Sequence, residues 1–486
     1  MMVSMVTSSL TPSLVWKYFE AISAIPRGSK NEAAIGKYVM KVAAGLDLTA
    51  FQDHAGNVVV RKPATKGNEK KPSVCLQGHL DMVCEKTPET KHDFLKDPIK
   101  LQIVDGHLMG TGTTLGADNG IAVAASLAIM EDKSLAHGPL EFLFTVDEET
   151  GLTGANELQP GFVESRILLN LDSEEEGELY VGCAGACDTI GHWPAKFDAA
   201  PKGATWRSIT IAGLRGGHSG LEIEKNRGNA IKILSRLLTL AADCGARVSS
   251  MNGGSKRNAI PRDAHAIVCV PASKAEVMEI AIGVLTKSIA AEMATVEPGF
   301  TVSVTSVKAK NARVLARPLQ TKILRTISAM PHGAVKMSSD IPGLTETSTN
   351  VAVLSTDKKR VTLATSQRSS VASENDEIAD TVRAIFALGG ADVLETDGYP
   401  GWKPNLASPI LATAKKTYKK MFGKEPAVKA VHAGLECGII GEKYPGMDMV
   451  SMGPTLEAVH SPDEKIYIDT VDKYWQFLLG ILSNVK

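Results

Sequence analysis

Short apolar runs alternate with helical patterns through about the first 180 residues of the chain. The runs at 71–80, 140–146 and 165–172 have the pattern of buried strands, and residues 14–25 and 120–131 carry apolar side chains at helical spacing. This alternation predicts an α/β fold with a largely parallel sheet covered on both faces by helices. In such a sheet, binding sites lie at the carboxyl ends of the strands.

The pattern of predicted strands and helices changes near residue 188. Residues 188–397 contain a run of strand and helix patterns typical of an α+β domain, and later segments resume the first pattern. A chain of 486 residues also exceeds the roughly 250–300 residues at which one core stops growing. We therefore expect a discontinuous catalytic domain, 1–187 with 398–486, interrupted by an inserted domain, 188–397. Two related α+β halves would account for the length of the insert, although no sequence repeat marks them.

Charge and cysteine usage restrict the partners of this protein. The 53 Lys and Arg nearly cancel the 54 Asp and Glu, with no block of like charges that would bind nucleic acid or an anionic membrane. No apolar run approaches the roughly 18–20 residues of a membrane span. The seven Cys are scattered, and no signal peptide pattern opens the chain, which predicts a cytoplasmic protein. Cys183 and Cys187 are interpreted as buried thiols rather than a metal site.

His79 and Asp81 lie at the end of the predicted strand at 71–80. Residues two apart in a strand point to the same face, so Asp81 can hydrogen-bond the imidazole of His79 and leave its other nitrogen for a metal. A histidine at a strand end is more often structural than a ligand. The pair by itself does not establish a site.

Further acidic residues and one histidine stand at comparable positions. Asp118 lies between two glycines before a helix, where an N-cap is the alternative interpretation. The others are Asp147, Glu148 and Glu149 after the strand at 140–146, Asp172, and His460 in a late loop. Mixed His and carboxylate ligation suits Zn²⁺, Mn²⁺ or Co²⁺, and two such ions form a hydrolytic device. One glutamate of the 148/149 pair can serve as the general base if it stays unligated.

Five ordered motifs, GHLDMV, GADNG, DEETG, NLDSEE and EAVHSPDE, resemble the M20 metallopeptidase family. Four more, RGGHSG, SKRNAIPR, SQRSSV and HAGLECG, resemble its aminoacyl-histidine dipeptidase branch. The resemblance covers essentially the whole chain. It implies a zinc-peptidase-like catalytic domain carrying an inserted lid or dimerisation-like domain, and hydrolysis of Xaa-His and other unblocked dipeptides.

The resemblance also implies two divalent metal ions, with Zn²⁺ expected and Mn²⁺ or Co²⁺ as alternatives. His79 and Asp172 would bind one ion, and Glu149 and His460 would bind the other. Asp118 would bridge both ions. Asp81 would orient His79, and Glu148 would activate the bridging water and then protonate the departing amine. The peptide bond after Asp118 is expected to be cis.

The insert receives a role from the same resemblance. His218 would donate to the tetrahedral oxyanion once the domains close, with Asn258 assisting. Arg368 would clamp the substrate's carboxylate, and Glu436 would contact its free amine. His432 is either structural or part of the pocket lining.

Two other functions remain compatible with these residues. One is an M20-type amidohydrolase acting on N-acyl amino acids, and the other is a non-catalytic peptide-binding scaffold. The presence of Glu148 and of all five implied ligands disfavours the scaffold. A homodimer is a further expectation that the sequence leaves open.

Overall fold

The structure is a computed structural model that describes residues 6–308, 313–396 and 398–486. The chain divides into two compact units. Unit 1 comprises residues 1–182, 404–430 and 435–486, and unit 2 comprises residues 183–403 and 431–434. The predicted boundaries, 187/188 and 397/398, lie a few residues inside unit 2. The short return of residues 431–434 to unit 2 was not anticipated.

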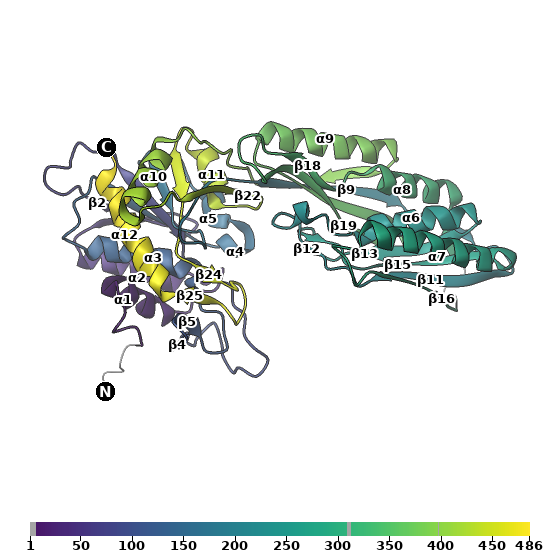
Figure 1. The fold of residues 1–486 in the computed structure, drawn as a ribbon, viewed down its shortest axis with the longest axis horizontal. Coiled ribbons are helices and arrows are strands. Elements are labelled where there is room, and N and C mark those ends of the chain that lie inside the picture. The colour runs from purple at the N-terminus through teal and green to yellow at the C-terminus, as the bar shows by residue number, and fades with distance from the viewer. Residues whose placement is uncertain (1–5, 309–312, 397) are drawn as a thin grey trace. The chain divides into compact units, whose positions relative to one another are not determined.

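Unit 1 is built on an eight-stranded sheet in the order β1-β2-β6-β3-β7-β23-β8-β22, of which β2 and β22 are labelled in Figure 1. Its strands are β1 Thr49–Gln52, β2 Val58–Lys62, β3 Val74–His79, β6 Leu140–Thr145, β7 Ile167–Asn170, β8 Glu178–Cys183, β22 Ala427–Val431 and β23 Asp448–Ser451. The central strands β6, β3, β7 and β23 are parallel, whereas β1, β2 and β8 pair antiparallel. The predicted parallel sheet is therefore its centre.

Every residue of β3 and β6 is buried, because helices cover both faces at the centre of this sheet. The described residues of unit 1 form eight helices. They are α1 Ser13–Ser23, α2 Ala33–Gly45, α3 Ala117–Glu131, α4 Glu148–Gly151, α5 Thr153–Glu157, α10 Pro409–Phe422, α11 Glu436–Lys443 and α12 Ile468–Asn484. Helix α10 shows how local sequence sets the ends: Ser408 accepts from the Leu411 amide, Pro409 follows, and Gly423 ends the helix at φ 72°.

A second, four-stranded sheet in unit 1 carries the late histidine loop. Its order is β24-β25-β5-β4, with β4 Leu101–Val104, β5 His107–Gly110, β24 Leu456–Glu457 and β25 Lys465–Tyr467. The loop that contains His460 connects β24 to β25. Among the described residues, no helix combines the length and apolar character needed to span a membrane.

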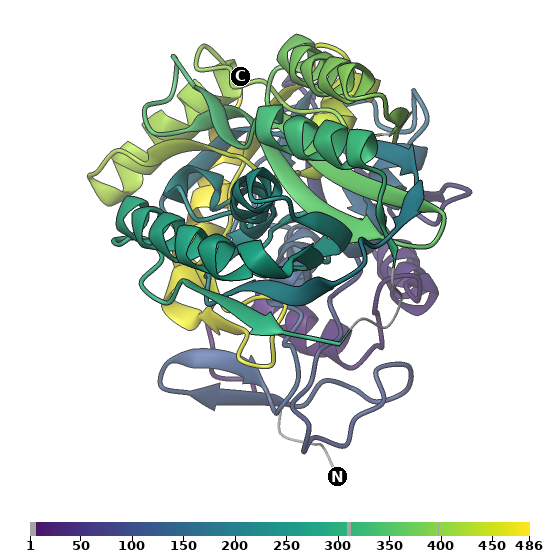
Figure 2. The same cartoon turned by 90° about the vertical axis from the view of Figure 1, so that its right-hand side faces the viewer.

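Unit 2 is built on a nine-stranded antiparallel sheet in the order β16-β11-β15-β13-β19-β20-β9-β21, with β18 also paired to β19. Its strands are β9 Gly185–Pro194, β11 Ala204–Ala212, β13 Arg247–Gly253, β15 Ala264–Pro271, β16 Thr301–Ser306, β18 Gly333–Met337, β19 Thr345–Thr356, β20 Arg360–Ser369 and β21 Asp392–Glu395. Helices α6 Ala230–Asp243, α7 Ala275–Glu292, α8 Arg317–Ala329 and α9 Ala372–Leu388 lie together against it (Figure 2).

Two small ribbons complete unit 2: β10 Phe197–Ala199 with β17 Arg313–Leu315, and β12 Gly217–His218 with β14 Ala259–Ile260. The large sheet continues across its middle where Gly253 of β13 faces Leu354 of β19. Strands β11, β13, β15 and β16 lie on one side of this junction, and the remaining strands of the large sheet lie on the other. Helix α7 contacts β16 of the first set and α9 contacts β9, β20 and β19 of the second, whereas α6 and α8 pack on each other and both contact β13.

Candidate metal centre

Polar residues of the site lie at the carboxyl ends of three parallel strands. Strand β3 ends at His79, and the chain reaches Asp147 and Asp172 just after β6 and β7 end. Because β3 pairs in parallel with both neighbours, the carboxyl ends of all three strands meet at one edge of the sheet. This is the edge at which the sequence pattern predicted a site.

Five side chains form two overlapping groups that could each hold a cation. In the first group, Nε2 of His79 lies 3.1 Å from Oδ1 of Asp118 and 3.5 Å from Oδ1 of Asp172. In the second, Nε2 of His460 lies 3.1 Å from Oδ2 of Asp118 and 3.0 Å from Oε2 of Glu149. The possible ligand atoms of each group all lie within 4.8 Å of one another. Asp118 thus offers a different oxygen to each group.

Asp81 orients several of these residues at once. Its Oδ1 lies 3.2 Å from Nδ1 of His79 and accepts the Glu148 amide at 3.1 Å. Its Oδ2 accepts the Glu149 amide at 3.2 Å and the Ser29 hydroxyl at 2.8 Å. Asp81 is fully buried, so this single carboxylate holds the His79 ring and the start of α4 in a fixed relation.

Asn119 has a positioning role that the sequence did not reveal. The peptide bond between Asp118 and Asn119 is cis, as the resemblance implied. The Asn119 side chain accepts the His79 amide at 3.3 Å and donates to the Leu171 carbonyl at 2.9 Å. It therefore connects three of the segments that carry possible ligands. Its place beside Asp118 in GADNG was the available signal.

The electrostatics of the centre indicate a shortage of positive charge. Burial raises the pKa of Asp172 to about 6, although His79 opposes the shift. Hydrogen bonds to Asp118 and Glu149 raise the pKa of His460 to about 11. Oε1 of Glu149 is buried without a hydrogen-bond partner in the described parts of the chain. Excess negative charge and an unsatisfied carboxylate oxygen fit the binding of divalent cations.

Glu148 stands beside the two groups. It also falls within a group with His79 and Glu149, so proximity alone does not exclude it as a ligand. The ion pair to His460 is made by Glu149, which ties Glu149 to the second group. Burial raises the pKa of Glu148 well above its usual value, with His79 opposing and Asp172 adding to the rise.

Glu436 lies in unit 1, at the first position of α11, and its side chain is fully buried. Its Oε2 accepts from Nε2 of Gln77 at 2.6 Å and from the Thr145 hydroxyl at 2.7 Å. The other oxygen has no partner among the described residues. Contact with a substrate amine stays a prediction, while the observed contacts join α11 to the ends of β3 and β6.

His218 belongs to unit 2 and presents a defined hydrogen-bonding state. Its Nδ1 accepts the amides of Gly220 and Leu221 at 3.2 and 3.1 Å, which requires the proton to be on Nε2. Burial and the charge of Arg368 lower the pKa of His218 to about 4. At neutral pH the ring is therefore uncharged, with Nε2–H as its donor.

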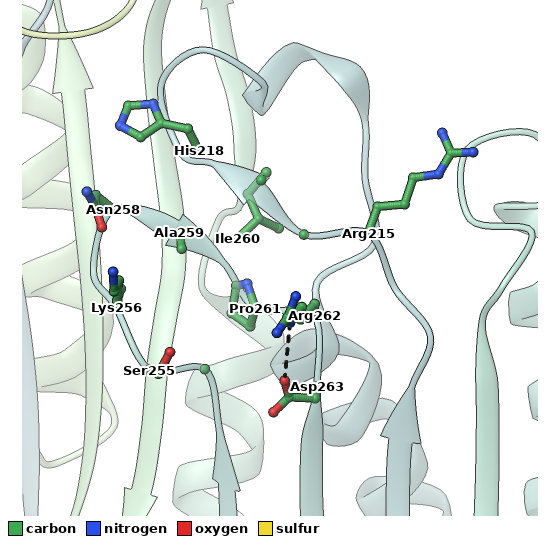
Figure 3. Close-up of a pocket in the computed structure, with 13 residues that line it drawn as sticks. Arg215, His218, Ser255, Lys256, Asn258, Ala259, Ile260, Pro261, Arg262 and Asp263 are labelled. Atoms are coloured by element: carbon green, nitrogen blue, oxygen red, sulfur yellow. Dashed lines mark ion pairs between the residues drawn. The ribbon is translucent and has the colours of Figure 1, made fainter. Parts of the chain in front are cut away.

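The other predicted substrate residues also lie in unit 2. His218 and Asn258 line a pocket of about 380 Å³ beside the β12–β14 ribbon (Figure 3). Arg368 is buried and donates to the Tyr399 hydroxyl at 2.9 Å, and its Nε has no partner among the residues that the structure describes. His432 is also buried, with Nε2 2.7 Å from the Ser348 hydroxyl.

The α/β unit with a histidine- and carboxylate-lined sheet edge defines a metal-dependent hydrolase. The model of peptidase family M20/M25/M40 matches residues 75–484. The chain belongs to this family.

Two of the relatives are 40% identical to this chain over nearly its full length. The chain is 40% identical over 479 residues to the cytosol non-specific dipeptidase of Escherichia coli (strain K12), covering 98% of this chain and 99% of that protein. The crystal structure of the aminoacylhistidine dipeptidase from Vibrio alginolyticus has a TM-score of 0.92 at 40% identity, covering 99% of this chain and 98% of the other. The aminopeptidase PepT of Bacillus cereus has a TM-score of 0.57 at 18% identity, covering 98% of this chain and 99% of that one, and shares the fold.

Proposed function

We propose that this protein is a metal-dependent dipeptidase that hydrolyses Xaa-His and other unblocked dipeptides. The observation that carries the proposal is the carboxylate of Asp118, whose two oxygens approach His79 and His460 in separate ligand groups. Near-full-length identity to a cytosol non-specific dipeptidase supports the substrate class. A cytoplasmic location is proposed on the same likeness.

Five residues would hold the two cations: His79, Asp118, Glu149, Asp172 and His460. Their imidazole and carboxylate donors suit Zn²⁺, which we propose, and also Mn²⁺ or Co²⁺. When bound, such ions polarise a carbonyl and lower the pKa of water. Asp81 holds the His79 ring so that Nε2 faces the cation position.

Glu148 would move the proton. We propose that its carboxylate takes a proton from the attacking water and gives one to the departing amine. Two observations support the role: its amide is fixed by Asp81, and Glu149, rather than Glu148, pairs with His460. Burial favours the protonated carboxyl, which suits the second of these two proton transfers.

Recognition of both substrate ends would make the enzyme a dipeptidase. Arg368 is proposed to bind the free carboxylate, which its buried Nε without a partner in the described chain supports. Asn258 would assist His218 at the oxyanion, and Glu436 would serve the free amine. A buried site that needs both charges rejects longer or blocked peptides, because one charge would then stay unpaired.

A substrate panel tests the function directly. Protein loaded with Zn²⁺ or Mn²⁺ should hydrolyse Xaa-His dipeptides, carnosine-like dipeptides and ordinary unblocked dipeptides. It should act poorly on C-terminal amides, acetylated amino acids and tripeptides, with kcat/KM as the measurement. Activity confined to acetylated amino acids would instead identify an N-acyl amidohydrolase. Binding without turnover of any substrate would identify the scaffold. Sedimentation at several protein concentrations tests the homodimer.

Substitution of His218 tests the oxyanion donor. His218→Ala should lower kcat by about 10²–10³-fold, the usual cost of removing one such donor. Since its pKa is lowered to about 4, His218 stays neutral above about pH 5. Its titration should therefore not cause kcat to fall with decreasing pH in the range above about pH 5. The pH profile of the variant should therefore keep the wild-type shape. His192→Ala, at a half-buried position of β9 remote in sequence from the ribbon, serves as the control; equal activity of the two variants would exclude the role.

A further inference from the structure

Glu464 is a buried carboxylate that belongs to neither ligand group and takes no part in the proposed reaction. It stands directly before β25 and is 2% exposed. Its Oε2 accepts the amides of Leu115 and Gly116 at 2.7 and 2.9 Å. Its Oε1 accepts those of Ala117 and Asp118 at 2.7 and 3.2 Å. One side chain thus satisfies four consecutive backbone donors that lead into Asp118.

Arg27 holds the same turn from its carbonyl side. Its guanidinium donates to the carbonyls of Leu80 and Asp81 at 3.0 and 2.8 Å and also to the carbonyl of Gly116. A Cβ on Gly116 would lie 2.6 Å from Nη2 of Arg27, and φ there is 70°. The turn before Asp118 is therefore fixed between a buried anion and a buried cation.

Glu464 joins the loop that carries His460 to this turn. His460 is about half exposed, and Ser461 donates to the Ala458 carbonyl within the loop. In the described chain, the hydrogen bonds from side chains of residues 458–463 stay within the loop, apart from that of His460 itself. Glu464, four residues after His460, is therefore the anchor that joins the loop to the backbone of Asp118.

We propose that Glu464 is a positioning residue that sets the separation between Asp118 and His460. It thereby determines how tightly the group Asp118, Glu149 and His460 binds its cation. The inference rests on the dinuclear function proposed above. The physical reason is that an exposed loop would otherwise sample many positions, and each displacement of the imidazole weakens ligation.

Metal binding to the Glu464→Gln variant tests this proposal without measuring activity. Glutamine keeps the size of the side chain, but its NH₂ group would face two amide donors and cannot accept from them. Metal-free protein is titrated with Zn²⁺, and separately with Mn²⁺, against a chromophoric chelator. We expect the Kd of the more weakly bound cation to rise about 10–100-fold, the usual effect of losing a residue that orients ligands. Glu457→Gln, an exposed glutamate of the same loop region, should bind both cations as the wild type does.

The outcomes separate this proposal from its premise. If folded Glu464→Gln binds both cations with wild-type constants, Glu464 only stabilises the fold and the proposal is wrong, whatever happens to Tm. If Glu464→Gln does not fold, Glu464→Asp, which keeps the charge on a shorter side chain, decides by the same comparison. If the wild-type protein binds no second cation, the dinuclear function itself fails.

Discussion

Replacing Glu148 by alanine is expected to lower kcat by at least about 10²–10⁴-fold, the contribution of a general base. KM and the number of bound metal ions should stay close to those of the wild type, because the cations are held by other side chains. Steady-state kinetics on an unblocked dipeptide and elemental analysis of the purified variant provide the two measurements.

Glu175→Ala is the matched control for Glu148→Ala. Glu175 belongs to the neighbouring acidic run, is exposed, and pairs with Lys429 at 3.2 Å, so its removal should leave kcat unchanged. Near-normal turnover of Glu148→Ala would remove Glu148 from the role of base. Loss of a bound ion from that variant would instead identify Glu148 as a ligand, which its proximity to His79 and Glu149 permits.

Removing the metal ions should abolish hydrolysis and destabilise unit 1. A chelator should eliminate activity, and added Zn²⁺ or Mn²⁺ should restore it. Because cations bind the folded site and not the unfolded chain, each bound cation should raise the free energy of unfolding by about 2.7–4.1 kcal/mol when free metal exceeds its Kd by 100–1,000-fold. Thermal unfolding with and without metal measures this difference.

Asp118→Asn should remove most of that metal-dependent stabilisation. The substitution takes away the charge that both ligand groups share, so metal should neither activate the variant nor raise its Tm as in the wild type. Asp463→Asn, an exposed position in the His460 loop, is the control. A full metal-dependent rise in Tm for Asp118→Asn would contradict the bridging role.

Local patterns were sufficient to predict the main elements. The apolar run at 71–80 became β3, and the small apolar residues at 120–131 became most of α3. A strand that is buried on both faces, such as β3, is apolar along most of its length, which is the pattern expected of a sheet covered by helices. The antiparallel flanks of the sheet could not be predicted, since pairing direction depends on strand order rather than on composition.

The candidate ligands were predictable in kind because each follows an apolar strand or stands in a glycine-marked turn. Arg27 and Glu464 were not predicted, although Glu464 lies within the quoted motif EAVHSPDE. A glutamate in a loop is usually exposed, and nothing local indicates that the carboxylate of Glu464 accepts four amides from residues 115–118. Those contacts span about 350 positions of sequence.

The sequence by itself determined the alternation of strands and helices, the presence of an insert, and the types of side chain available for metal binding. Tertiary structure alone decided that the two oxygens of Asp118 approach different histidines, that Nδ1 of His218 is an acceptor, and that Glu464 holds the turn before Asp118. The physical reason is that the sequence pattern reports burial and local conformation. Hydrogen bonds between distant segments depend on distances of about 3 Å, which only the packed chain defines.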